Sequence, residues 1–347
     1  MSVTMNKKIA LFTDLHLGIH QNSLFWHGVA LKWTDWFVSE LEKKNIKDII
    51  FMGDFFDHRD EVAVNTLHVG YQVLSKLKEY NIIMIPGNHD SFYRDHAEIN
   101  SLNIVQGWSN IQLLNKTSQL MLGTKLATFV PWGGDVNKVP KSDYVFGHLE
   151  INTFRLHGTK VCDKGIEPTS VLNLSPRVYS GHFHLRDKRE YQNSYINYVG
   201  NPFEMNFGDI NNQKGVYILD LNNDTEEFIT NDISPKHCKI FASEVANTDV
   251  KKYKQSIANN IVKLIVDIKI SADAIDKIQK NIILYKPALC TVEFLLNIND
   301  IDMLKDISAD MSGVNIENSI TQFVNNLEIK EKKELISECL GYYNNIK

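Results

Sequence analysis

The chain has 347 residues, of which 43% are hydrophobic and 23% are charged, and its formal net charge is −5. This length favours one large domain and one small one, and the composition is typical of a globular protein. A net negative chain offers no global attraction to nucleic acid or to an anionic membrane. Its four cysteines form no CxxC pair, and no stretch reaches the roughly 20 apolar residues of a membrane span. We therefore expect a cytoplasmic protein without a disulfide framework.

The first part of the chain alternates short apolar runs with longer amphipathic stretches. The runs at 9–12, 49–52 and 82–85 predict strands, and a polar or glycine-containing turn follows each of them. Residues 24–43 and 62–79 carry apolar side chains at three- and four-residue steps, which predicts two helices. Strands and helices in this alternating order indicate an α/β protein with parallel strands.

The later part of the chain is richer in predicted strands. They span 125–130, 143–146, 178–179, 195–199 and 216–219. The pattern changes at 231–238, after which 261–270 predicts a strand, 272–285 a helix and 290–296 a half-buried strand. Two short helices are predicted last, around 316–327 and 335–343. The predicted division is a large domain at 1–235, a small α+β domain at 236–300 and a C-terminal helical segment at 301–347.

Five short segments place metal-binding side chains at or just past predicted strands. In chain order they are Asp14-Leu15-His16, Gly53-Asp54-Phe55-Phe56-Asp57, Gly87-Asn88-His89-Asp90, Gly147-His148 and Gly181-His182-Phe183-His184. Each segment alone is weak evidence, because a turn or a structural histidine pair would also explain it. Ligands of α/β sheets gather beyond the carboxyl ends of the strands, so the common location of these segments supports a common site.

The ligand types predict a site for two divalent metal ions. Nitrogen and oxygen donors without cysteine suit Mn or Fe and tolerate Zn. Asp54, at a tight glycine turn, is placed to bridge both ions. The other ligands are Asp14, His16 and His184 for one ion, and Asn88, His148 and His182 for the second. Two ions held in this way activate a water for in-line attack at phosphorus.

His89 is left outside both ligand sets. Because it neighbours Asn88, it is the candidate general acid or transition-state stabiliser near the leaving oxygen. We expect Asp57 to orient His89 and to hold it protonated. Asp90 is a candidate supporting residue behind the ligands, and Arg59 is a candidate phosphate contact.

These segments resemble those of the calcineurin-like metallophosphoesterases and, within them, the SbcD-type or Mre-eleven nucleases. Among these, the chain looks like the recombination endonuclease subunits of T-even-like phages. Further matching stretches are Val130-Pro-Trp132, Tyr198-Val-Gly-Asn-Pro202 and Lys214-Gly215. The resemblance rests on motifs over roughly residues 8–220, and on layout alone over the last third.

The resemblance implies a four-layer α/β/β/α metallophosphoesterase sandwich with a small α+β capping domain. It also implies a C-terminal helical segment that docks on an SbcC-like ABC/SMC-type ATPase. The implied activity is Mn-dependent exonuclease and endonuclease cutting of DNA in recombination and repair, in the cytoplasm of the phage host. A homodimer through the helices at 24–43 and 62–79 is a further implication.

Two alternative functions stay open at this point. The same scaffold carries phosphatases and small-molecule phosphodiesterases, although these have little use for the region after residue 235. A non-catalytic binding module would lack a ligand, and no ligand position is missing here. Some family members have a histidine where this chain has Asp57, so the partner of His89 is an open point. No G-x-x-x-x-G-K-[ST] loop is present, so any ATPase must be a separate protein.

Overall fold

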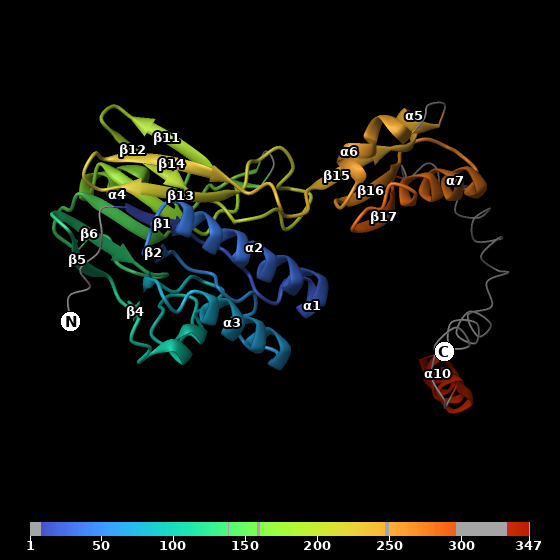
Figure 1. The fold of residues 1–347 in the computed structure, drawn as a ribbon, viewed down its shortest axis with the longest axis horizontal. Coiled ribbons are helices and arrows are strands. Elements are labelled where there is room, and N and C mark those ends of the chain that lie inside the picture. Colours follow the sequence, from blue (N-terminus) through green and yellow to red (C-terminus); the bar gives the residue numbers. More distant parts are fainter. Residues whose placement is uncertain (1–7, 138, 158–159, 247–249, 296–331, 347) are drawn as a thin grey trace. The chain divides into compact units, whose positions relative to one another are not determined.

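The structure is a computed structural model that describes residues 8–137, 139–157, 160–246, 250–295 and 332–346. The chain forms two compact units. The first comprises Met1–Cys238 with Asn259–Ile261, and the second comprises Lys239–Ala258 with Val262–Lys347. All five ligand segments belong to the first unit (Figure 1).

The first unit contains two mixed sheets of six strands each. The first sheet has the order β14-β13-β1-β2-β3-β4, with parallel pairing from β1 to β4 and antiparallel pairing at β13 and β14. Its strands are β1 (Lys8–Phe12), β2 (Asp48–Phe51), β3 (Asn81–Met84), β4 (Ile111–Leu113), β13 (Gly215–Asp220) and β14 (Thr225–Thr230).

The second sheet has the order β11-β12-β10-β7-β6-β5. Its four inner strands are parallel, and β5 and β11 add antiparallel edges. The strands are β5 (Ser118–Leu122), β6 (Lys125–Val130), β7 (Tyr144–His148), β10 (Arg177–Gly181), β11 (Asp187–Tyr191) and β12 (Ser194–Tyr198).

Apolar side chains bury both faces of the central strands. Along β1, Ile9 and Leu11 pack in a cluster that joins the two sheets, whereas Ala10 and Phe12 pack in a cluster with the helices. Successive side chains of a strand point to opposite faces, so a strand covered on both sides has to be apolar throughout. This is why the runs predicted from the sequence were continuous instead of alternating.

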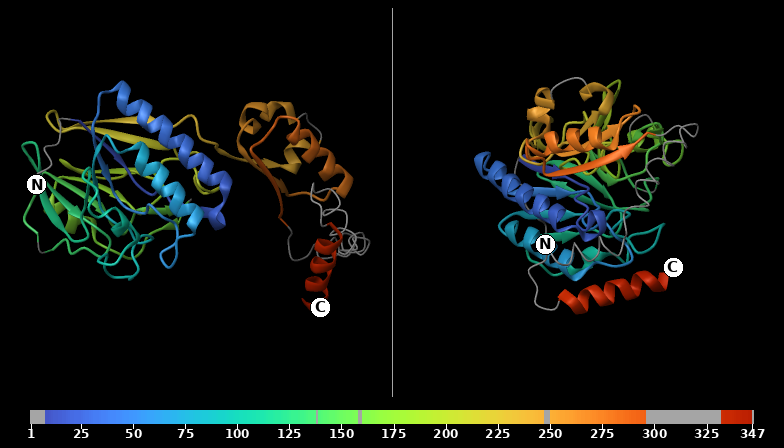
Figure 2. Two further views of the ribbon diagram at one scale, coloured as in Figure 1. Left: turned by 60° about the horizontal axis from the view of Figure 1, so that its bottom comes forward. Right: turned by 90° about the vertical axis from the view of Figure 1, so that its right-hand side faces the viewer.

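Helices cover the outer faces of the two sheets (Figures 1 and 2). The first sheet is covered by α2 (Leu24–Lys43) and α3 (Val64–Lys76), with Trp33 and Phe37 of α2 against Phe12. The second sheet is packed by α4 (Pro168–Leu174), which adds Val171 and Leu174 to its outer apolar cluster. The smaller elements are α1 (Ile19–Asn22), η1 (Ser101–Val105), β8 (Arg155–His157) and β9 (Lys160–Val161).

The second unit has a sheet of the order β15-β16-β17, in which the first residues of β15 and β16 belong to the first unit. Its elements are β15 (His237–Phe241), α5 (Ala242–Val245), η2 (Val250–Tyr253), α6 (Lys254–Ile257), β16 (Ile261–Val266), α7 (Ala272–Ile283), β17 (Leu289–Phe294) and α10 (Lys332–Ile346). The helix predicted around 316–327 lies outside the described residues. Among the helices that the structure describes, none is both long and apolar enough to cross a membrane.

The predicted α/β class is confirmed, in the form of two mixed sheets. The predicted helix at 24–43 matches α2 at both ends, and the helix predicted at 62–79 is shorter, as α3. The strands predicted at 9–12, 49–52 and 82–85 are β1, β2 and β3. Because parallel neighbours end at one edge of a sheet, the turns after these strands lie together.

Candidate metal centre

The five ligand segments meet at the carboxyl ends of the parallel strands. They follow β1, β2 and β3 in the first sheet, and they end or follow β7 and β10 in the second. Asp14, His16, Asp54 and His182 have φ values of 54°, 46°, 59° and 89°, which are unusual for residues other than glycine. Strained backbone of this kind persists where the surrounding structure holds it, and it concentrates at functional sites.

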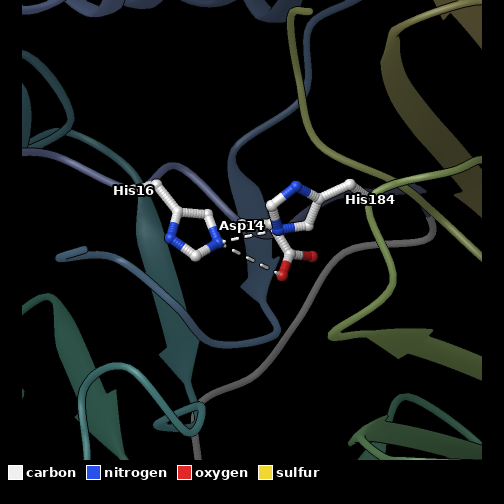
Figure 3. A group of neighbouring side chains, drawn as sticks. All are labelled: Asp14, His16 and His184. Atoms are coloured by element: carbon white, nitrogen blue, oxygen red, sulfur yellow. Dashed lines mark hydrogen bonds and ion pairs between the residues drawn. The ribbon is translucent and has the colours of Figure 1, made fainter. Parts of the chain in front are cut away.

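One group of candidate ligands comprises Asp14, His16 and His184. Figure 3 shows the two imidazole rings and the carboxylate converging from three directions. The Nε2 atoms of His16 and His184 lie 3.0 Å apart, and His16 Nε2 lies 3.9 Å from Asp14 Oδ1. These are the three side chains that the sequence predicts for one ion, apart from the shared Asp54.

A second group comprises Asp54, His148 and His182. Asn88 completes it, because its Oδ1 lies 3.0 Å from His148 Nε2 and 2.8 Å from His182 Nδ1. Asp54 Oδ2 lies 3.3 Å from His148 Nε2 and 3.6 Å from His16 Nε2. This single carboxylate oxygen therefore faces ligands of both groups.

The hydrogen-bond pattern fits bound cations. His148 Nδ1 lies 2.7 Å from the carbonyl oxygen of Met52, which can only accept, so Nδ1 carries the proton. In the neutral ring Nε2 then carries a lone pair, which faces the oxygen atoms of Asn88 and Asp54. Acceptors that converge without a donor repel one another unless a cation lies between them. The donor set of histidine, carboxylate and amide suits a divalent transition metal.

The pKa values of the site show the same demand for positive charge, which either a bound cation or a proton on a ring nitrogen can meet. Burial opposes the charged form of His148, yet the Asp54 carboxylate raises its pKa to about 9. His16 behaves in the same way: burial opposes its charge, but the hydrogen bond that it donates to Asp57 raises its pKa to about 9. Burial lowers the pKa of His182 and that of His184 to about 3, so both rings stay neutral. The carboxylates thus attract positive charge to this centre.

Glycines allow the ligand turns to approach one another closely. A Cβ atom on Gly53 would lie 2.4 Å from His148 Nδ1, and one on Gly87 would lie 2.2 Å from Asp54 Oδ1. Gly53 also has a φ of +96°, which other residues rarely adopt. The packing of the ligands thus requires glycine at both positions.

The structure corrects the expected role of the Asp57 side chain. Its Oδ1 accepts a hydrogen bond from His16 Nδ1 at 3.0 Å, not one from His89. His89 Nδ1 instead lies 2.5 Å from the backbone oxygen of Asp57. The turn after Asp54 directs the carboxylate toward His16 and the carbonyl toward His89. Asp57 therefore contacts both histidines, each through a different oxygen.

Two other predicted residues support the ligand turns. The buried carboxylate of Asp90 accepts four backbone N–H groups, from Asp54 at 2.8 Å, Gly87 at 3.0 Å, Phe55 at 3.0 Å and Phe56 at 3.1 Å. It ties the turn after β2 to the turn after β3. Arg59, the candidate phosphate contact, donates from Nη2 to the backbone oxygen of Asn88 at 2.8 Å. This nitrogen of its guanidinium group is therefore already hydrogen-bonded within the protein.

The family model of the calcineurin-like phosphoesterases matches residues 7–186 of this chain. The chain belongs to the calcineurin-like phosphoesterase family. This phosphoesterase is similar to exonuclease subunit 1 of Enterobacteria phage T4, with 25% identity over 275 residues that cover 74% of the chain and 79% of the phage protein. The resemblance expected from the motifs, including the relationship to T-even phages, is confirmed.

Two solved structures are also similar to this phosphoesterase. A single mutant of Vps29 from Entamoeba histolytica has 12% identity and a TM-score of 0.32, and the match covers 65% of this chain and 99% of Vps29. The nuclease MPE of Pseudomonas putida has 16% identity and a TM-score of 0.31, and the match covers 60% of this chain and 83% of the nuclease.

A buried ion pair lies behind the candidate ligand His184, and the sequence alone does not reveal its role. Lys214 Nζ donates to the backbone oxygen of His184 at 2.6 Å and contacts Asp209 Oδ1 at 2.8 Å. Both side chains are almost completely buried. The pair therefore fixes the backbone that carries His184. The stretch Lys214-Gly215 resembles the family, but the spacing of Asp209 and Lys214 alone carries no information about His184.

Proposed function

We propose that this phosphoesterase is the metal-dependent DNA nuclease subunit of an SbcCD-like recombination and repair complex. The observation that carries the proposal is the position of Asp54 between two ligand groups, with His89 beside them. The similarity to a phage exonuclease subunit supports DNA as the substrate.

Each ligand group would hold one divalent ion, and we propose that both ions are Mn²⁺. Asp14, His16 and His184 would hold the first, Asn88, His148 and His182 the second, and Asp54 would serve both. Bound ions would supply a water of lowered pKa as the nucleophile, and they would neutralise charge on the phosphate oxygens.

The protein groups around the ligands set up the proton transfer. The N–H of His89 donates to Asp54 Oδ1 at 2.8 Å, which leaves Oδ2 for the ions. The Nδ1 proton of His89 is held by the Asp57 carbonyl, so Nε2 is the atom that can deliver a proton to the leaving oxygen of the DNA backbone. Asp57 keeps the His16 ring in the tautomer that offers Nε2 to a metal.

The rest of the chain would serve the complex. We assign residues 1–235 to the nuclease domain, 236–300 to a capping domain and 301–347 to a segment that docks on an SbcC-like ATPase. The division of the chain near Cys238 supports the first boundary. The complex would act in the cytoplasm of the phage host and cut DNA as both an exonuclease and an endonuclease.

The decisive experiment measures Mn²⁺-dependent cleavage of linear duplex and single-stranded DNA, with and without the ATPase. We expect cleavage that is lost when EDTA removes the metal. Nitrophenyl phosphate esters serve as the comparison substrates. If they were hydrolysed well while both DNA forms stayed intact even with the ATPase, the protein would be a phosphatase or a small-molecule phosphodiesterase. If no substrate were hydrolysed but metal were bound, it would be a binding module.

A further inference from the structure

An exposed aromatic pair directly follows the ligand segment Gly87–Asp90. Phe92 keeps 52% of its surface exposed and Tyr93 keeps 41%. The two rings meet edge to face, with centroids 5.0 Å apart at an interplanar angle of 86°. Contiguous exposed apolar surface is a common feature of binding sites. Neither ring has a role in the metal centre described above.

The loop that carries this pair is held in shape by its own hydrogen bonds. The N–H of Phe92 donates to the backbone oxygen of Ile99 at 3.0 Å, and Ser91 forms a β-bridge with Asn100. The Tyr93 ring packs on the ring of His96, with centroids 4.5 Å apart and planes 30° from parallel. A surface that is ordered before its ligand arrives loses less entropy on binding.

Trp132 fastens the same loop to the metal centre. Its Nε1 donates to the backbone oxygen of Arg94 at 2.7 Å, and its ring centroid lies 5.1 Å from that of the candidate ligand His182. The next residue, Gly133, approaches the loop so closely that an added Cβ atom would lie 2.1 Å from the Asp95 oxygen. One indole therefore contacts both a metal ligand and the loop with the aromatic pair.

We propose that Phe92 and Tyr93 form a stacking platform for an unpaired base next to the phosphodiester that is cut. The inference rests on the proposed nuclease function and specifies its substrate as DNA with unpaired bases, in a single strand or at a frayed end. Stacking on aromatic rings tolerates any base, because every base has a π-face. Arg94 is exposed in the same loop and supplies a cation for the neighbouring phosphate.

The position of the pair favours DNA over a protein partner. Tyr93 is four residues from His89, the proposed proton donor, and Trp132 couples the loop to His182. Any strand whose phosphate lies at the metal centre has its neighbouring bases within a few ångströms of that phosphate. A docking surface for a protein subunit would not need to be fastened to a metal ligand.

The test compares binding of intact and abasic single strands. Fluorescence anisotropy in Mn²⁺ would measure the Kd of phosphorothioate oligonucleotides, which resist cleavage, with one abasic site placed at each position in turn. At one or two positions, loss of the base should raise the Kd of the wild-type protein by about tenfold. In Tyr93→Ala and Phe92→Ala this ratio should fall to near one, and Tyr93→Phe should restore it.

A matched control is Tyr71→Ala, which removes a tyrosine of α3 with 60% exposure and should leave the base-to-abasic ratio unchanged. The platform would be refuted if the wild-type protein bound abasic strands equally well at every position, or if the ratio survived both alanine variants. If the alanine variants kept the base-to-abasic ratio but no longer bound the ATPase, the loop would be a protein-docking surface instead. If the wild-type protein cuts DNA and shows no base dependence, only the platform fails. If it neither cuts nor binds DNA, the nuclease proposal fails as well.

Discussion

The carboxylate of Asp57 holds the imidazole of His16, with Oδ1 and Nδ1 3.0 Å apart, while the backbone oxygen of the same residue holds His89. A histidine that binds metal through one nitrogen commonly donates its other N–H to a carboxylate, which fixes the ring and its tautomer. Asp57 therefore links a proposed metal ligand to the proposed proton donor. Its side chain and its backbone have separable functions.

Asp57→Ala is the first test of this separation. The substitution removes the oxygen that orients His16 but keeps the carbonyl that holds His89. We expect Mn²⁺ affinity to fall by about 10–100-fold, as measured by isothermal titration calorimetry. Asp57→Asn retains a hydrogen-bond acceptor, so its Mn²⁺ affinity should fall less. Asp60→Ala, in the same loop, is the control and should bind Mn²⁺ like the wild type. Unchanged affinity in Asp57→Ala with reduced turnover would show that the carboxylate acts through His89.

Asp54 and His89 should separate metal binding from turnover. Asp54→Ala removes the oxygen that faces both ligand groups, so both ions should be lost. His89→Ala leaves every proposed ligand in place and should retain two Mn²⁺ per chain, while turnover falls by about 10²–10⁴-fold. Metal content by atomic emission and cleavage of a labelled oligonucleotide measure the two effects. If His89→Ala lost metal along with activity, its role as the proton donor would be wrong.

The elements that could be predicted from the sequence are those with a regular burial pattern, such as strands buried on both faces. Strands such as β1 and β2 are buried on both faces, so they are apolar throughout and easy to recognise. Strands β11 and β14 do not stand out in the sequence because they are partly exposed, and β11 is charged at four of its five positions while β14 contains two glutamates. Their place comes from pairing with β12 and β13, and local sequence does not encode that pairing.

The candidate ligands could be predicted because each follows a recognisable strand. The residues that hold these ligands in place could not be predicted, because their contacts depend on the path of the backbone between distant segments. The three-residue interval from Asp54 to Asp57 does not reveal which histidine the carboxylate meets, and 41 residues separate it from His16. Lys214 directly precedes β13 of the first sheet and His184 follows β10 of the second, so their contact depends on how the two sheets pack.

The buried pair of Lys214 and Asp209 should contribute strongly to stability. Burial lowers the pKa of Lys214, yet its ammonium is retained by Asp209 and by the His184 carbonyl. Lys214→Met would leave the Asp209 carboxylate buried without its cation, which should cost about 3 kcal/mol of unfolding free energy. Urea denaturation measures this cost, and a Mn²⁺ titration should show weaker binding through His184. Lys44→Met, which breaks a surface pair with Glu227, should cost less than about 1 kcal/mol. Equal stability of the two variants would contradict the prediction.

The C-terminal segment should be required for the ATPase partner but not for hydrolysis. Only its last helix, α10, falls within the described residues. Deletion of residues 315–347 is expected to abolish co-purification with the SbcC-like ATPase. Hydrolysis of a small nitrophenyl phosphodiester should continue, because the ligands lie in the first unit. Unchanged co-purification would remove the docking role from this segment.

Asp224 should make stability depend on pH, because it joins the two sheets. It lies in the turn between β13 and β14 and accepts hydrogen bonds from Tyr144 Oη at 2.6 Å, Lys125 Nζ at 2.9 Å and Arg177 Nη2 at 2.9 Å. Burial opposes its charge, but the hydrogen bond from Tyr144 and the two cations hold its pKa below the usual range. The folded state therefore favours the carboxylate. Its contribution is complete above the unfolded pKa of ~4 and is lost as the pH falls through the lower folded value.

Asp224→Asn should therefore lower the unfolding free energy by about 1–2 kcal/mol at pH 7, and the difference from wild type should shrink as the pH falls below ~4. Urea denaturation in EDTA over this pH range separates the effect from metal binding. Asp232→Asn, whose side chain is 73% exposed beside Lys236, is the matched control and should stay within about 0.5 kcal/mol of wild type at both ends of the range. A difference for Asp224→Asn that persisted unchanged into acid would mean that the amide disturbs packing and that the charge of Asp224 does not stabilise the fold.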